Sequence, residues 1–345
     1  MYVPNDRWTW SFTLVALFQA IVALALEAYV FGRFEASLHS GASEQSAART
    51  IPTYLSLYIF GFIYELVLVW DALRVKNTIQ VIGICLYNVG MLIYSAVKMD
   101  QINDAIRELT KGNFIEPGIW DDLRPFLVAA PAVLALGTVA LSFCAWKLYG
   151  VFSWDIYKSI SADLQLKRRF LVFQVYITLL KLDFFFFLAF TVQFLVIVGG
   201  SFEDAEIILT IIAIPVTIII LWLAAVVTRR ESYAGQACII VIYFAAMAYF
   251  IFKLFRMYDN NNPEKVLEYY PARKSLTTFA VLTILLLVVT IGAAGMCTRN
   301  FNKGLAPHVR RRKIASPEDS YKPYPSAHDL NAHPMGPVPN RMTID

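Results

Sequence analysis

The stretch Leu179–Phe190 reads LLKLDFFFFLAF, and it decides which kind of fold this chain can adopt. It places Lys181 and Asp183 inside a long run of apolar and aromatic residues. About 20 such residues cross the hydrocarbon core of a bilayer as an α-helix. A charge near the centre of such a helix costs about 3 kcal/mol or more, so both side chains need partners inside the protein.

The composition of the whole chain also indicates a membrane protein. Of its 345 residues, 58% are hydrophobic and 16% are charged, and the mean hydropathy is +0.55. These values are too apolar for an average soluble domain.

Several segments are long and apolar enough to span a membrane as helices. They lie at about 8–31, 53–73, 78–97, 126–149, 170–198, 207–227, 233–255 and 276–297. We therefore predict an all-α polytopic membrane protein built as a bundle of about eight transmembrane helices.

The distribution of basic residues predicts the orientation of these helices. With eight spans, one side of the membrane carries both termini and the loops at 74–77, 148–169 and 228–232. That side is rich in Lys and Arg, whereas the longer loops opposite mix their basic residues with many acidic ones. The positive-inside rule therefore predicts that both termini lie in the cytosol.

Residues 298–345 form a polar, proline-rich segment that cannot bury enough apolar area to fold, so we predict a disordered cytosolic tail. We expect the tail to meet anionic lipid headgroups or cytosolic protein partners. A phosphate on Ser316 would oppose the attraction to lipid. The residues of the tail that would attract the anionic headgroups form a basic cluster of Arg310, Arg311, Arg312 and Lys313.

Two segments outside the spans show the periodicity of amphipathic helices. Apolar residues between positions 99 and 109 predict a separate short helix on the lumenal membrane surface, ended by Gly112. A similar pattern between positions 156 and 164 predicts a surface segment on the cytosolic side.

Polar residues inside the predicted spans are the candidates for a functional site, because intramembrane ionisable groups usually face a protein interior or a wet cavity. Glu27 lies near the end of its span, and we expect it to reach the membrane interface. The other candidates are Glu65 in the second span, Asn88 in the third, and Gln174, Lys181, Asp183 and Gln193 in the fifth.

On an α-helix, Lys181 and Asp183 point about 200° apart and cannot pair with each other. We therefore expect the fifth span at the centre of the bundle, with separate partners for its two charges. Glu65, about midway along the second span, is the expected partner of Lys181. Three roles remain open for these residues, namely structural ion pairs, a transport or ligand site, and catalysis.

Sequence motifs give no support to catalysis. The chain contains no HExxH, GxSxG or P-loop motif. Its four histidines fall outside the spans, and its four cysteines lie in or at the ends of spans without metal-ligand spacing. We expect a protein that is not an enzyme, with no cofactor, metal or nucleic-acid partner.

Four stretches resemble a fungal family of uncharacterised Golgi apparatus membrane proteins. They are LFQAIVALALEAYVF at 17–31, YELVLVWDALRVKNTIQVIGICLYN at 64–88, FQVYITLLKLDFFFFLAFTVQFLV at 173–196, and RMTID at 341–345. The resemblance implies a multi-spanning protein of the Golgi or nearby endomembranes, and it carries over no activity or site residues.

Two classes of function remain. The first is a non-enzymatic scaffold, sorting or sensor protein of the Golgi membranes. The second is a transporter or channel in which Lys181, Asp183 and Glu65 line a path. A wet cavity converging on these residues would favour transport, and a dry bundle with closed ion pairs would favour the first class.

Overall fold

The computed structural model describes residues 6–39, 46–159, 164–197, 205–258 and 273–303. Eight helices in these ranges are long and apolar enough to cross a membrane, which confirms the predicted helical membrane bundle. They are α1 (Arg7–Ala36), α2 (Ser46–Val75), α3 (Thr78–Lys111), α4 (Ile119–Ser159), α5 (Leu164–Ile197), α6 (Ala205–Arg230), α7 (Tyr233–Met257) and α9 (Arg273–Arg299). The predicted tail lies outside the described residues from position 304 onward.

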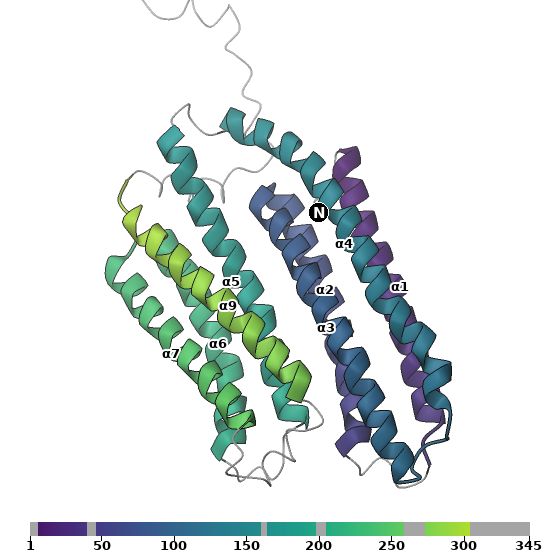
Figure 1. Ribbon diagram of the computed structural model, residues 1–345. Coiled ribbons are helices and arrows are strands. Elements are labelled where there is room, and N and C mark those ends of the chain that lie inside the picture. The colour runs from purple at the N-terminus through teal and green to yellow at the C-terminus, as the bar shows by residue number, and fades with distance from the viewer. Residues whose placement is uncertain (1–5, 40–45, 160–163, 198–204, 259–272, 304–345) are drawn as a thin grey trace, which may run out of the picture.

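The helices form two consecutive groups of four that lie side by side (Figure 1). In the first group, each of α1 to α4 packs against the next along the chain, and α4 closes the ring by packing on α1. In the second group, α5, α6, α7 and α9 are arranged in the same way. Both groups are therefore up-down-up-down four-helix bundles, the arrangement that short connections between antiparallel neighbours favour.

The chain alternates between the two ends of this assembly. One end, here called the tail end, holds the start of α1, the α2–α3 turn, the α6–α7 turn and the end of α9 (Figure 1). The α4 helix has 41 residues, which corresponds to about 60 Å, so it is much longer than the hydrocarbon core of a bilayer. Figure 1 shows that the last turns of α4 and the first turns of α5 extend past the α2–α3 turn at the tail end.

An aromatic seam joins the two groups where α2 and α3 pack against α5. Phe185 of α5 lies at its centre, and its ring is 4.7 Å from that of Tyr87 and 5.7 Å from that of Phe60, centroid to centroid. The ring of Tyr64 is also stacked 5.7 Å from Phe185. Phe186 completes the seam by packing edge-on against Phe185. These contacts are of the kind that aromatic side chains prefer in dry interiors.

Two glycines of α3 allow α5 to approach closely. A Cβ atom at Gly83 would lie 2.7 Å from Cγ2 of Thr178, and one at Gly90 would lie 2.7 Å from the ring of Phe186. Both distances are shorter than any real carbon contact. The absence of a side chain at these positions therefore sets the distance between the two helices, as small residues do in many membrane-helix interfaces.

The prediction of a separate surface helix at 99–109 is wrong. Residues 78 to 111 form one continuous helix, α3, because neither glycine nor proline interrupts the sequence between Gly90 and Gly112. The apolar residues of its second half, Ile102, Ile106 and Leu109, are buried against the rest of the bundle. Gly112 does cap the helix, as expected, and its N–H donates to the carbonyl of Glu108.

The surface segment predicted at 156–164 is only partly described. The α4 helix continues to Ser159 and α5 begins at Leu164. Residues 160–163 and the side chains that define the predicted apolar face lie outside the described part of the chain.

Gly90→Ala is expected to lower the thermal unfolding midpoint of the purified protein in detergent, because the new methyl group overpacks the seam against Phe186. Overpacking of this kind typically costs about 1–3 kcal/mol. Gly292→Ala in α9 is the matched control, since nothing lies within 4 Å of its Cβ position. The control should unfold at or above the wild-type temperature, and equal loss in both variants would contradict the close-approach explanation.

Candidate functional site

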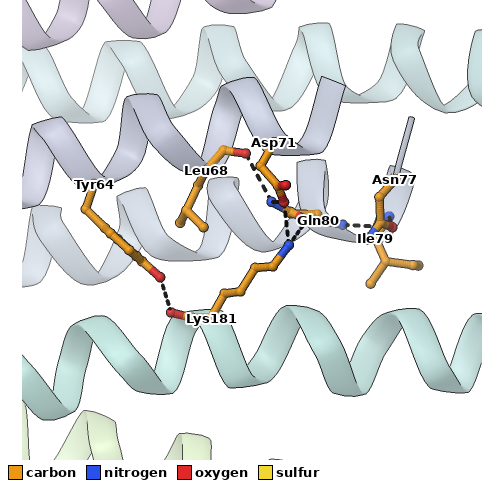
Figure 2. A network of polar contacts seen from close by, with 7 residues as sticks. All are labelled: Tyr64, Leu68, Asp71, Asn77, Ile79, Gln80 and Lys181. Atoms are coloured by element: carbon orange, nitrogen blue, oxygen red, sulfur yellow. Dashed lines mark hydrogen bonds and ion pairs between the residues drawn. The ribbon is translucent and has the colours of Figure 1, made fainter. Parts of the chain in front are cut away.

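Lys181 is held by side chains from α2 and α3 that face each other next to the α2–α3 turn (Figure 2). Its Nζ forms an ion pair with Asp71 and donates a hydrogen bond to Oε1 of Gln80 at 2.8 Å. Nε2 of Gln80 in turn donates to Oδ2 of Asp71 at 2.9 Å and to the carbonyl of Leu68 at 3.1 Å. The lysine thereby connects α5 to both helices of the α2–α3 hairpin.

The local structure of the hairpin positions this network. Asn77 caps α3 through Oδ1, which accepts hydrogen bonds from the N–H groups of Ile79 and Gln80. Tyr64 of α2 donates its hydroxyl to the carbonyl of Lys181 at 2.7 Å, which gives the same turn of α5 a second contact with α2 (Figure 2). The side chains of Lys181 and Asp71 are 31% and 33% exposed, so this pair lies at the edge of the interface between the two groups.

The predicted pair between Lys181 and Glu65 is wrong. A helical side chain leans toward the N-terminus of its own helix. Because α5 begins at the tail end, Lys181 reaches toward the α2–α3 turn, where Asp71 lies. Glu65 is six residues before Asp71 on α2, which is about 9 Å along the helix axis and farther from that end.

Glu65 belongs to a separate network inside the first group. Its Oε1 accepts a hydrogen bond from Nδ2 of Asn88 at 2.7 Å, and Oδ1 of Asn88 accepts one from Nε2 of Gln19 at 2.6 Å. Gln19 lies against Gly137 of α4, where it occupies the space that a side chain would need. All three polar residues are buried. One residue from each of the four helices therefore meets at this point.

Asp183 lies on the other side of α5 from the hairpin, and its partner comes from α9. Oγ1 of Thr290 donates a hydrogen bond to Oδ2 of Asp183 at 2.7 Å, and the aspartate is 1% exposed. Farther along the same interface, Nε2 of Gln193 donates to Oγ of Ser275. Gln174 is buried on α5 as well, but among the described contacts none joins it to Lys181 or Asp183.

Glu27 does not reach the membrane interface, contrary to expectation. It is buried and forms an ion pair with Lys98 of α3, whose side chain is 1% exposed. The ring of Tyr58 lies over this lysine, with Nζ 3.9 Å from the ring centroid. Within the described residues, this is the most deeply buried ion pair, and it joins α1 to α3 in the half of the bundle away from the tail end.

Four of these partners were missed from the sequence for identifiable reasons. Lys98 lies one residue beyond the predicted end of the third span, where the sequence gives no sign that a charge is buried. Asp71 and Gln80 flank a short turn, and that spacing in a helical hairpin could have indicated that they face each other. Gln19 has no distinguishing pattern, since one amide in an apolar helix predicts no particular partner.

A pocket between α5 and α6 bears on the transport alternative. Its volume is about 180 Å³, counting space open to the surroundings, and its lining is apolar apart from two threonines. None of Lys181, Glu65 and Asp183 lines it. The lining residues are Phe184, Phe187, Leu188, Thr191, Ile214, Thr217 and Ile218. This pocket therefore does not indicate an ion path.

The fold and these networks define the class of protein: a polytopic α-helical membrane protein of two four-helix bundles, each with buried polar contacts inside it, joined by an aromatic seam and by the partly exposed contacts of Lys181. No known family profile matches the chain, and no solved structure matches it. A UPF0658 Golgi apparatus membrane protein of the fission yeast Schizosaccharomyces pombe is 32% identical to it over 318 residues, covering 85% of this chain and 87% of the relative. The chain belongs to this family of Golgi apparatus membrane proteins.

A double-mutant cycle tests the revised pairing. Lys181→Ala and Asp71→Ala should each destabilise the protein, and the double variant should recover part of the loss, giving a coupling energy of about 1–3 kcal/mol. That range lies between the values for exposed and for fully buried pairs, because both side chains are one-third exposed. The measurement is unfolding in mixed micelles.

Lys181→Ala combined with Glu65→Ala provides the matched control cycle. These two changes should be additive, because the two residues belong to different networks. A coupling between Lys181 and Glu65 as large as that between Lys181 and Asp71 would contradict the arrangement described.

Proposed function

We propose that this protein is a non-enzymatic, multi-spanning component of the Golgi membrane, of the scaffold, sorting or sensor type. The observation that supports this proposal is that Lys181, Glu65 and Asp183 each take a partner from a neighbouring helix. These three residues belong to three different networks and do not converge on one cavity. Such contacts are what a bundle needs to keep polar groups satisfied in hydrocarbon.

Transport is the second candidate, and one observation favours it. Oε2 of Glu65 and Oδ1 of Asp183 are buried and accept no hydrogen bond within the described residues. Both carboxylates have uncharged partners. Buried carboxylates of this kind are common in ion and proton pathways, where a mobile cation satisfies the remaining oxygen.

Ion flux into proteoliposomes distinguishes the two candidates. The full-length protein is reconstituted, and gradients of protons, Na⁺ and K⁺ are imposed in separate experiments with a dye enclosed for each ion. We expect the wild type and Glu65→Gln to behave like protein-free vesicles. A flux that is lost in Glu65→Gln or Asp183→Asn, with both variants still folded and reconstituted, would overturn the structural proposal in favour of transport.

We also propose that both termini lie in the cytosol, and that the tail there meets anionic lipid through Arg310–Lys313 or binds cytosolic proteins. The excess of Lys and Arg at the tail end supports this orientation. A protease-sensitive reporter fused after Asp345 should be digested in intact Golgi vesicles, and one inserted at Gly112 should be protected. The reverse pattern would show that the orientation is inverted.

A further inference from the structure

The second group of helices carries a cluster of basic residues at the tail end, here called the basic collar. Its members come from three separate segments, which are the start of α5, the end of α6 and the end of α9 (Figure 1). They are Lys167, Arg168, Arg169, Arg229, Arg230, Arg299 and Lys303. Five of them are arginines, the residue type best suited to bind a phosphate group through two parallel hydrogen bonds.

Contacts between the segments hold the collar together. Nη1 of Arg169 donates to the carbonyl of Lys303 at 2.7 Å, which joins the start of α5 to the residues that follow α9. The hydroxyl of Tyr233, at the start of α7, donates to the carbonyl of Phe301 at 3.1 Å. Phe301 is itself buried. The three helix ends are therefore fixed relative to one another.

The collar has little negative charge to neutralise it. In the described helix ends that form it, the one acidic residue is Glu231, and its Oε2 accepts a hydrogen bond from the N–H of Asn302 at 2.8 Å. The side chains of Arg168, Arg229, Arg230 and Arg299 are exposed. The collar thus presents these four guanidinium groups outward.

The collar also lies at the depth of lipid headgroups. Its residues directly flank the apolar segments of α5, α6 and α9, so they fall where the hydrocarbon core ends. Basic pockets between transmembrane helices at this depth are suited to polyanionic lipid headgroups. A headgroup with a single charge would engage only part of such a cluster.

We propose that the basic collar is a binding site for a phosphorylated inositol headgroup of a membrane lipid. Arginines from α5, α6 and α9 would surround the monoester phosphate, and the acyl chains would lie along the apolar faces of the same helices. This site belongs to the folded bundle and is distinct from the basic cluster of the tail.

Binding of short-chain lipids to the full-length protein in neutral detergent tests the proposal. The probes are dioctanoyl phosphatidylinositol monophosphate, phosphatidylserine and phosphatidylcholine, with soluble inositol phosphate included to separate a lipid site from a free-phosphate site. We expect the inositol lipid to bind at least about 10-fold more tightly than phosphatidylserine. The triple variant R168Q/R229Q/R230Q should lose at least about 10-fold in this affinity.

Two control variants keep the test specific. R107Q/K111Q/R124Q removes the same charge from exposed positions at the opposite end of the bundle and should bind like the wild type. R310Q/R311Q/R312Q/K313Q removes the tail cluster and should retain the high-affinity binding. The proposal is overturned if either control loses binding as strongly as the collar variant, or if the collar variant remains folded and binds normally. It is also overturned if the soluble inositol phosphate binds as tightly as the lipid.

Discussion

A polar side chain within the hydrocarbon must find its partner on another helix, and this requirement sets the register of the first four helices and of α5 against them. Three polar contacts lie at successive levels of that bundle. Glu27 pairs with Lys98 in the half away from the tail end. Gln19, Asn88 and Glu65 meet at the next level toward the tail end. Lys181 contacts Asp71 and Gln80 beside the α2–α3 turn. A shift of any helix by one turn, about 5.4 Å, would break the contacts at its level. Apolar packing alone would not penalise such a shift as strongly, because lipid and leucine offer similar surroundings.

The polar contacts fix register, and the residues between them fix distance. Gly83 and Gly90 let α3 approach α5, while the aromatic seam around Phe185 fills the space that this approach leaves. At the end of the molecule away from the tail end, Nζ of Lys274 in α9 lies 2.5 Å from Oδ2 of Asp100 and 2.8 Å from Oδ2 of Asp104, both in α3. The two groups are thus held by charged contacts near both ends and by close packing between them.

The sequence was sufficient to predict the class of fold and the eight spans, because apolar runs of about 20 residues have few other interpretations. It also identified Glu65 and Asp183 as buried polar residues, and it placed α5 next to helices on both sides. Lys181 differs from this expectation, because its side chain is about one-third exposed at the edge of the interface. The pairings could not be predicted, because they depend on which helix ends lie at the same level and on how each side chain leans. Lys98 shows the limit most clearly, since it lies beyond the apolar run that predicts the third span and is buried only because α3 continues to Lys111.

The most direct test of this account is a charge swap at the buried Glu27–Lys98 pair, followed by thermal unfolding of the detergent-solubilised protein. Breaking a buried pair from one side typically costs about 3–5 kcal/mol. Glu27→Lys and Lys98→Glu alone should therefore each give little folded protein. The swapped double variant E27K/K98E should recover most of the wild-type abundance and stability. Single variants as stable as the wild type, or a double variant as unstable as the sum of the two, would contradict the claim that these contacts determine the fold.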